Sequence, residues 1–423
     1  MSVHCRIGVP LLRVGVLLAI ASVCAFGQPL DRFDGYVTKI VSPSQLEVNG
    51  VPVLTTKSTK VSGHSGKSKA ARADLNLYVG MPVVVHVKTN EKTATITATS
   101  IVVRPETERE VTGTGIVDAV LPSPAGAAED HLIRADGYSI LISTKTAITF
   151  DPPIDRASAF QTNAWVRFQG TQRADGVVAA DVIHFQANTV SDAQEKVVEK
   201  WDYDPKAVDP DQKQNGWSKA FKGVDPKRLA PYDDAAMQSR VETIGAKLVP
   251  KFQRELSDAD PAKIHFRFQV VDQSQWRDAV SLPSGVILVP HQVVEKMQND
   301  AQLATVLADN IASVLEKQLL RALPGRKKRE GAQLASDAAG IFVPGLGLAV
   351  LAANAAVTAD QKRHFEDESG RVSLYLLHDA GYDVFEAPLA WLRLELLLAP
   401  DGARLPHRAE YLYKMLGEEW HGN

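Results

Sequence analysis

One pattern of short alternating segments occurs twice in the chain, and it constrains the fold more than any other feature. In each copy an alternating apolar segment leads to a dipeptide typical of a tight hairpin turn, Asn49-Gly50 or Asp136-Gly137. A threonine-rich segment, a second alternating segment and a short closing segment follow. Five or so short strands in about 75 residues are typical of a small closed barrel of the OB-like kind. The repeat therefore predicts two small all-β barrels with antiparallel strands, at 28–104 and 110–187.

Both copies resemble the small β-barrel repeats of unknown function found in exported bacterial proteins, a resemblance that implies no functional residues. Four aromatic residues, Tyr78, Tyr138, Trp165 and Phe168, fall on the expected strands, mostly at inward positions. This placement predicts that they pack in the barrel cores. The alternative is a binding face for oligonucleotides or sugars, which requires exposed aromatic rings with basic neighbours.

The first 27 residues have the pattern of a secretory signal peptide. Arg6 and Arg13 precede or flank the apolar run "VGVLLAIASVC", and Ala25 and Gly27 are small residues before a cleavage point. We therefore expect an exported protein, periplasmic or secreted, that has lost residues 1–27. Both cysteines lie in this segment, so the mature chain must rely on its core rather than on disulfides. A lipoprotein acylated at Cys24 is the alternative.

Charge and hydropathy exclude some classes of function. The formal net charge of the 423 residues is −3, which argues against a general nucleic-acid binder. The stretch 338–359 is uncharged and long enough to cross a bilayer, but it contains Pro344 and several glycines. A buried or interfacial hairpin, with a possible peripheral membrane contact, is favoured over a membrane span.

Residues 188–232 are polar and rich in proline and aspartate, which is typical of a linker that wraps or docks on a domain. From 233 to 423 the periodicity becomes helical, with a strand at 263–272 and a hairpin at 278–290. A helix is predicted at 299–318. Its buried face carries three polar residues, Asp309, Asn310 and Ser313, where apolar side chains are expected.

The order of these elements resembles the zinc metallopeptidases of the CAAX-prenyl-protease superfamily, a gluzincin group that includes the HtpX and BepA types. The resemblance covers about 233–395. In that family a strand and an Asn-Ala-x-x-x-Pro-Gly-Gly hairpin precede a helix bearing His-Glu-x-x-His. A later helix carries Arg-x-x-Glu-x-Glu-Ala-Asp and leads to Ala-Gly-Tyr-Asp. The resemblance implies an α+β, mostly helical zincin-like domain. Together with the two barrels, this makes the fold class expected for the whole chain multidomain.

Laid on that pattern, "VLADNIASVL" takes the place of the motif helix. Asp309 and Ser313 then stand at the two histidine ligands, Asn310 stands at the catalytic glutamate, and Ile311 and Ala312 lie between. The other matching positions are the third-ligand position Glu368 and Pro283, Gly285, Arg363, Glu366, Gly381 and Tyr382. The chain departs from the family at Asp278, Ser284 and Gly370, which replace Asn, Gly and Asp.

These replacements predict the loss of zinc and of the general base. Two histidines at i and i+4 direct nitrogens at one Zn²⁺, and the glutamate between them takes a proton from the bound water. An amide at Asn310 cannot accept that proton. We therefore expect no zinc, no other cofactor and no catalytic residue. We also expect Asp309 and Glu368 to lie close together, with an Arg or Lys or ordered solvent between them.

The expected function is that of a catalytically inactive pseudo-peptidase, a scaffold or binding module of the cell envelope. Its partner would be an extended peptide or protein tail bound by strand addition, and not a nucleic acid. One alternative is an active metalloendopeptidase that holds zinc or another metal through Asp309, Glu368 and His364. A further alternative assigns the function to the barrels.

Overall fold

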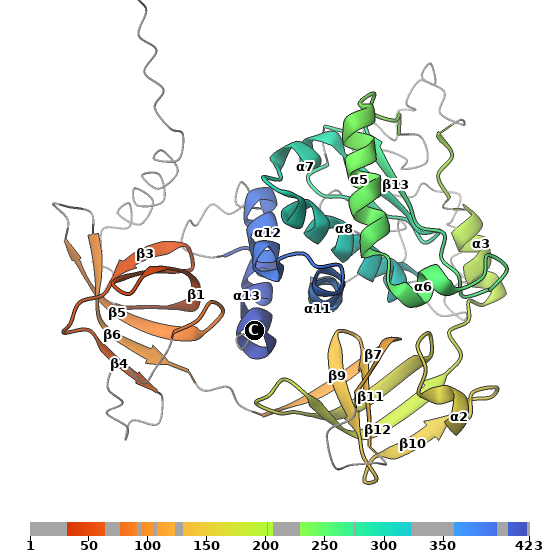
Figure 1. Cartoon of the computed structure of the whole chain (residues 1–423), viewed down its shortest axis with the longest axis horizontal. Coiled ribbons are helices and arrows are strands. Elements are labelled where there is room, and N and C mark those ends of the chain that lie inside the picture. Colours follow the sequence, from red (N-terminus) through yellow and green to blue (C-terminus); the bar gives the residue numbers. More distant parts are fainter. Residues whose placement is uncertain are drawn as a thin grey trace, which may run out of the picture. The chain divides into compact units, whose positions relative to one another are not determined.

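The computed structural model describes residues 32–63, 77–90, 93, 95–104, 108–122, 130–200, 202–205, 229–274, 276–322, 359–395 and 405–420 (Figure 1). The chain forms two compact units, one of Met1–Glu106 with Glu395–Asn423 and one of Thr107–Leu394. The predicted signal peptide, 1–27, lies outside the described residues, as does the apolar stretch 338–359 apart from its last residue. Among the helices of the described ranges, none is long and apolar enough to cross a membrane.

The first unit contains a closed barrel, barrel 1, that fills the span predicted for the first repeat. Its strands are β1 (Arg32–Ser42), β2 (Gln45–Val48), β3 (Val51–Leu54), β4 (Lys60–Gly63), β5 (Pro82–Asn90) and β6 (Thr95–Val103). They pair in the order β3-β2-β1-β5-β6-β4, and a further β3–β6 pairing closes a ring of five strands. The core is aliphatic, and Tyr78 packs against it.

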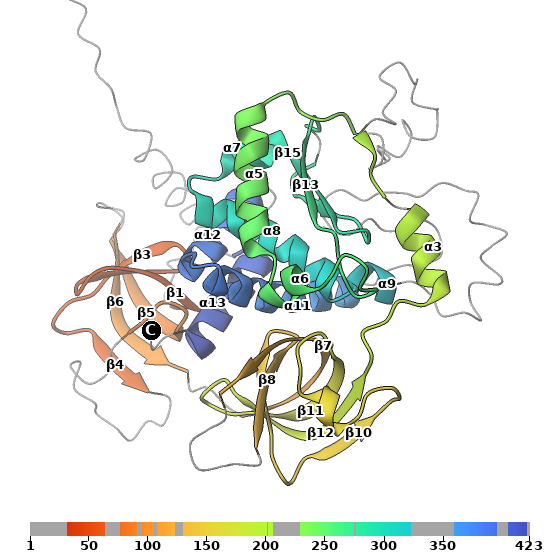
Figure 2. The ribbon, with the colours of Figure 1, turned by 45° about the vertical axis from the view of Figure 1, so that its right-hand side comes forward.

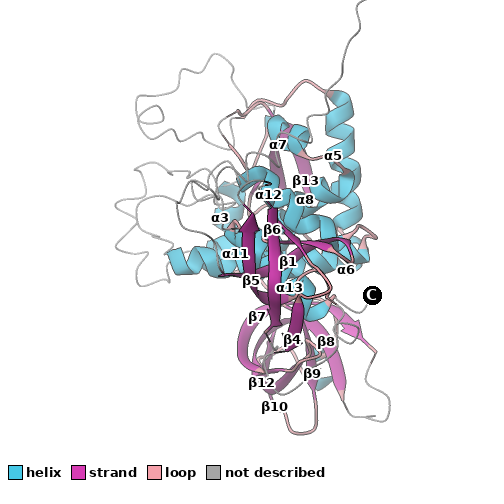
Figure 3. Ribbon diagram, turned by 90° about the vertical axis from the view of Figure 1, so that its left-hand side faces the viewer, coloured by secondary structure: helices cyan, strands magenta, loops and turns pink. Residues whose placement is uncertain are grey.

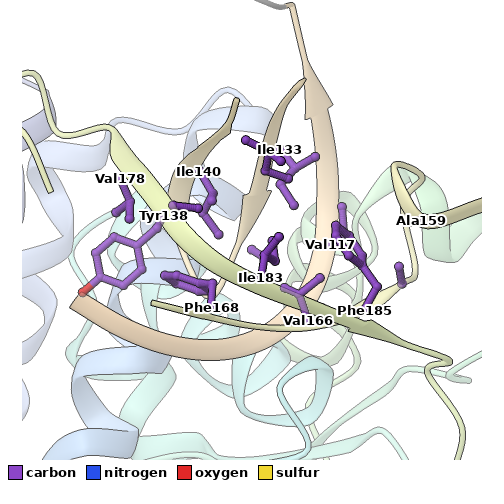
Figure 4. Packing of buried hydrophobic residues seen from close by; sticks show 14 of the residues in the cluster. Val117, Ile133, Tyr138, Ile140, Ala159, Val166, Phe168, Val178, Ile183 and Phe185 are labelled. Carbon is purple, nitrogen blue, oxygen red and sulfur yellow. The ribbon is translucent and has the colours of Figure 1, made fainter. Parts of the chain in front are cut away.

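Barrel 2, in the second unit, has the same strand order. Its elements are β7 (Arg109–Leu121), β8 (His131–Ala135), β9 (Tyr138–Ile142), β10 (Ala147–Phe150), α2 (Arg156–Ala159), β11 (Trp165–Gln172) and β12 (Val178–Gln186). The order β9-β8-β7-β11-β12-β10 closes through β9–β12, as in barrel 1. Figure 4 shows Tyr138, Phe168 and Phe185 among the aliphatic side chains of its core. Core packing is therefore confirmed for Tyr138 and Phe168. Trp165 is buried, but it lies outside this core cluster and beside Lys317, and Tyr78 packs on the core of barrel 1 from a loop rather than from a strand.

Equivalent hydrogen bonds confirm that the barrels are copies of one fold. The Thr59 hydroxyl donates to the Ala98 carbonyl over 2.7 Å, and the Thr146 hydroxyl donates to the Ala180 carbonyl over the same distance. Each threonine joins the start of the fourth strand to the sixth strand of its barrel. The two threonines thus hold the same junction in both copies.

Two expectations about the barrels are wrong in detail. The closing pairs β3–β6 and β9–β12 are parallel, as are β4–β6 and β10–β12. A closed ring with an odd number of strands cannot be antiparallel throughout, because strand direction alternates around it. Barrel 2 is also not entirely β, since α2 follows β10, with the Asp155 carboxylate accepting a bond from the Ser158 backbone N–H.

The predicted hairpin tips are present in both barrels. Asn49 and Gly50 have φ of 50° and 76°, and Asp136 and Gly137 have φ of 52° and 64°. These left-handed conformations are what a two-residue hairpin turn requires. The tips differ in their surroundings. A Cβ on Gly50 would meet no atom within 4 Å, whereas a Cβ on Gly137 would lie 2.5 Å from Arg371 Cβ.

The rest of the second unit is helical around a three-stranded sheet (Figures 2 and 3). The sheet order is β13-β15-β14, with β13 parallel to β15. The elements of this part of the chain are α3 (Asp192–Lys200), α5 (Ala235–Leu248), α6 (Lys251–Glu255), β13 (Arg267–Val271), β14 (Val280–Ser281), β15 (Val286–Pro290), α7 (His291–Lys296), α8 (Asp300–Leu315), α9 (Gln318–Ala322), α11 (Ala359–Asp379), η3 (Val384–Glu386) and α12 (Ala387–Glu395). Helix α8 packs against α5, α11 and the sheet.

One domain boundary differs from that expected. Helix α13 (His407–Glu419), placed by the sequence with the helical domain, packs on β1 of barrel 1. The backbones meet at Gly80 and Gly417, where a Cβ on Gly417 would lie 2.2 Å from the Gly80 carbonyl oxygen. The span 188–232, expected to be a linker that wraps or docks, contains α3, and its residues Tyr203 and Leu229 dock in the core beside the sheet.

The two hairpin tips allow a matched test of the contact between barrel 2 and α11. Both Gly50→Ala and Gly137→Ala put a Cβ on a left-handed backbone, but only the second drives it into Arg371. We expect the free energy of unfolding to fall by about 1 kcal/mol in Gly50→Ala and by about 2–4 kcal/mol in Gly137→Ala. Chemical denaturation of each variant, followed for the unit that carries the substitution, measures this fall. Equal losses would contradict the tight packing of this tip on α11.

Candidate functional site

Helix α8 places the polar trio in the interior of the second unit. Asn299 begins the helix as N-cap, its side chain accepting a bond from the Gln302 backbone N–H. Asp309 and Asn310 are only 4% and 1% exposed, and Ser313 is half-buried. The face that carries them is therefore covered by neighbouring elements rather than open to solvent.

Each buried member of the trio bonds within the protein. The Ser369 hydroxyl, on α11, donates to Asp309 Oδ1 over 2.7 Å. The Asn310 side-chain amide donates to the Val306 carbonyl one turn earlier in its own helix, over 2.9 Å. Asn310 is thus turned back onto α8, and Asp309 links α8 to α11.

Glu368 lies on α11 next to Ser369, and its side chain is fully buried. Arg321, from α9, donates to one carboxylate oxygen over 2.6 Å, and the Gln318 amide donates to the other over 2.7 Å. Burial raises the pKa of Glu368, against the opposing effect of the Arg321 guanidinium. Arg321 is therefore the basic neighbour of Glu368, whereas Asp309 accepts a bond from Ser369. Asp309 and Glu368 share the α8–α11 interface but bond to different partners.

Sequence reasoning missed a third buried carboxylate, Glu316, which is the C-cap of α8. It is 1% exposed, and its Oε2 accepts a bond from the Ile116 backbone N–H of barrel 2 over 3.3 Å. Burial first, and the charges of Glu368 and Asp136 next, raise the pKa of Glu316 well above its ordinary value. Nothing in the sequence shows which helix end meets the barrel.

The tip of barrel 2 completes this buried cluster of charges. Arg371 on α11 donates to Asp136 Oδ1 over 2.6 Å and to the Asp136 carbonyl over 3.0 Å. The Arg371 guanidinium also lies 4.4 Å from the centre of the Tyr138 ring. Burial raises the pKa of Asp136 to about 7, against the lowering effect of Arg371. We call Asp136, Glu316, Arg321, Glu368 and Arg371 the interface cluster.

Comparison of the two tips explains how Asp136 becomes available to Arg371. In barrel 1 the Asn49 side chain accepts a bond from the Tyr36 backbone N–H over 3.0 Å. In barrel 2 the equivalent N–H belongs to Ile116, and Glu316 accepts its bond instead. The helical part of the unit thus takes over a contact that barrel 1 makes within itself.

A second set of contacts holds barrel 2 to α11 further along the helix. Arg134 of β8 is buried and donates to Asp118 over 2.8 Å and to Asp379 over 2.5 Å. Its guanidinium also lies 4.5 Å from the centre of the Tyr375 ring. Lys317 Nζ donates to the Thr189 carbonyl and lies 5.2 Å from the Trp165 ring. The packing of barrel 2 on the helices is therefore rich in charge.

The other positions that match the metallopeptidase pattern have structural roles. Gly285, with φ of 91°, forms the turn that follows Pro283 between β14 and β15. Gly381, with φ of 70°, ends α11, and the Tyr382 N–H bonds back to the Leu377 carbonyl. Of the two charged positions, Arg363 is exposed and Glu366 pairs with Lys362 on the same helix.

The described residues contain no group of three or more His, Cys, Asp or Glu side chains that could hold a metal ion. The two histidines nearest the motifs in sequence also have other environments. His291 stacks on Tyr232 with ring centres 4.2 Å apart, and His364 is exposed beside Phe365.

A groove of about 760 Å³ lies elsewhere on the same unit, between α5, α6 and the amino-terminal end of β13. Its apolar lining comprises Ala246, Val249, Ile264, Phe266, Phe268 and Val286, among others. Arg254, Lys263 and Arg267 line it as well, against the single acidic residue Glu242. Because Arg267 is paired with Asp202, the groove is apolar with a small excess of positive charge from Arg254 and Lys263 over Glu242.

The edge of β13 that does not pair with β15 already forms hydrogen bonds with other parts of the chain. Gln238 accepts a bond from the Val270 N–H and donates to the Phe268 carbonyl, both over 2.8 Å. The Tyr232 N–H bonds to the Val270 carbonyl over 2.9 Å. A peptide could not add along the whole of β13 without displacing these bonds.

Comparison with known families bears on barrel 1. Residues 34–102 match a domain of unknown function, DUF5666. This span coincides with barrel 1, and it supports a domain boundary there without assigning chemistry. No curated protein matches the chain. The resemblance of 233–395 to zinc metallopeptidases has no support from these comparisons and stays a hypothesis.

The interface cluster predicts a pH-dependent stability of the second unit. An acid whose pKa is raised by folding binds its proton more tightly when folded, so stability falls as pH rises. The fall should extend from about pH 4, where free carboxyls titrate, through pH 7, where Asp136 titrates. Glu316→Gln keeps an acceptor for the Ile116 N–H but removes one buried charge.

We therefore expect Glu316→Gln to raise the Tm at pH 8 by a few degrees, to leave it nearly unchanged at pH 5, and to flatten the decline between them. Differential scanning calorimetry measures the Tm at each pH and thus its decline between pH 5 and pH 8. Glu366→Gln on α11, whose partner is Lys362, is the control and should leave the slope unchanged. A lower Tm for Glu316→Gln at pH 8 would mean that the ionised form stabilises the fold.

Proposed function

We propose that residues 233–395 form a zincin-like domain that no longer catalyses, and that the protein is a binding module for extended peptides. The observation that carries the proposal is the burial and the hydrogen bonding of Glu368. This carboxylate, at the position of the third zinc ligand, is fully buried and bonded to Arg321 and Gln318.

The positions that resemble a metal motif all lack what catalysis needs. A catalytic zinc takes three protein ligands and keeps one open position for water. The Arg321 guanidinium, 2.6 Å from Glu368, would repel a divalent cation at that ligand. Asn310 has no basic atom and points back to Val306. These contacts favour a structural role for the former site over the alternative of an active metalloendopeptidase.

The apolar groove beside β13 supports the choice of a peptide as ligand. Arg254 and Lys263 line it against the one carboxylate of Glu242, while Arg267 is already paired with Asp202, so the complementary ligand carries acidic as well as apolar side chains. Because Gln238 and Tyr232 cap the outer edge of β13, the peptide would lie in the groove rather than extend the sheet. We expect this binding in the cell envelope or outside the cell, because residues 1–27 have the pattern of a signal peptide.

The first test concerns the metal. Purified protein should hold no stoichiometric zinc and should not cleave fluorogenic casein above background. Restoring the motif through Asp309→His, Asn310→Glu and Ser313→His leaves Arg321 on Glu368, so this triple variant should bind zinc weakly. Adding Arg321→Gln frees the third ligand and should strengthen zinc binding at least tenfold.

Metal analysis and the zinc-induced shift in Tm report binding by each variant. Arg321→Gln in the otherwise unchanged chain is the control, and it should be destabilised by about 3–5 kcal/mol because it leaves a buried carboxylate unpaired. Chelator-sensitive cleavage by the unmutated protein would overturn the proposal and favour the peptidase alternative.

The second test concerns the groove. A fluorescein-labelled peptide of nine alternating leucine and aspartate residues should bind at least tenfold more tightly than its leucine–lysine counterpart, as measured by anisotropy. Arg254→Glu reverses a charge in the groove, and Ala246→Phe fills an exposed position on α5 that lines it. Both should weaken binding at least fivefold.

Lys251→Glu is the matched control, because Lys251 lies on α6 with Arg254 but outside the groove. This variant should bind the aspartate peptide as the unmutated protein does. Equal affinity for the two peptides, or unchanged affinity after both groove substitutions, would contradict peptide binding at this site.

A further inference from the structure

Barrel 1 carries a polar groove of about 650 Å³ on the surface formed by β4, β5 and β6. Six of its ten lining residues bear hydroxyl groups, namely Thr56, Ser58, Thr89, Thr97, Thr99 and Ser100. Asn90 adds an amide, and Lys60 and Lys88 add two ammonium groups. Among the described residues that line the groove, none carries a carboxylate or an aromatic ring.

Strand register places the two lysines on either side of β6. Lys60 of β4 is opposite Ser100, and Lys88 of β5 is opposite Thr97. Both lysines are exposed, and neither forms an ion pair or a hydrogen bond with the rest of the described chain. The two ammonium groups can therefore bind a ligand, and a row of hydroxyl groups on β6 lies between them.

Barrel 2 shows that the fold itself does not require this chemistry. By the same registers, Ala147 and Val182 take the places of Lys60 and Ser100. Thr171 and Ala179 take those of Lys88 and Thr97. The counterpart of Thr99 is a carboxylate, Asp181.

We infer that the groove on barrel 1 binds a sugar that carries oxyanion groups. Lysines attract the anion, and hydroxyl side chains, which both donate and accept hydrogen bonds, match the hydroxyl groups of a sugar. The volume lies within the range of small-molecule sites. The absence of aromatic side chains among the lining residues removes the stacking on which single-stranded nucleic acids depend.

Isothermal titration calorimetry on the full chain tests this with three probes. Trigalacturonate carries carboxylates, glucose 6-phosphate carries a phosphate, and maltotriose is neutral. We expect one or both anionic sugars to bind at least tenfold more tightly than maltotriose, and the tighter one identifies the source of the anion. Binding should weaken as ionic strength rises.

Variants separate this site from general surface charge. Lys60→Ala with Lys88→Ala should weaken binding at least tenfold, whereas the charge-matched pair Lys39→Ala with Lys145→Ala should not, since neither residue lines the groove. Thr99→Asp introduces the carboxylate of barrel 2 and should weaken binding more than Thr99→Asn. Maltotriose binding as tight as that of the anionic sugars would overturn the inference, as would no binding of either anion or full affinity in the Lys60/Lys88 variant.

Discussion

The burial of three carboxylates beside two guanidinium groups is the constraint on which the second unit depends. Asp136, Glu316 and Glu368 are each 1% exposed or less, so none can be solvated. Arg371 and Arg321 neutralise two of them, which leaves one negative charge that is most easily removed by a proton. The cluster joins the tip of barrel 2 to α9 and α11. The contact between the barrel and the helices therefore depends on the charges of the whole cluster.

The same contacts explain how helix α8 can carry polar residues and yet be buried. Asp309 is held by Ser369, and Glu368 by Arg321 and Gln318. These bonds offset the desolvation of the polar groups without a metal. The buried polar groups of α8 and α11 therefore serve the packing of these two helices. The binding that we propose lies on other surfaces, the groove beside β13 and the hydroxyl-rich groove of barrel 1.

Sequence patterns predicted the features that depend on neighbouring residues. The hairpin tips at Asn49-Gly50 and Asp136-Gly137 and the helix predicted at 299–318 are local. Features that depend on distant partners were missed. Glu316 is an ordinary residue at a helix end until Ile116 lies beside it, and the partner of α13 is decided by two glycines far apart in the chain, Gly80 and Gly417. The parallel closure of each barrel follows from its strand count, which the pattern left approximate.

The single exchange between Asn49 and Asp136 bears on how a tandem repeat folds without error. Two copies of one fold in one chain can compete for the same neighbour during folding. The tip of barrel 1 presents a neutral amide already engaged with Tyr36, and it has no charge to offer Arg371. The tip of barrel 2 presents a carboxylate, and Arg371 donates to it. The charge at this tip is thus one of the features by which the helices can distinguish the second copy of the fold from the first.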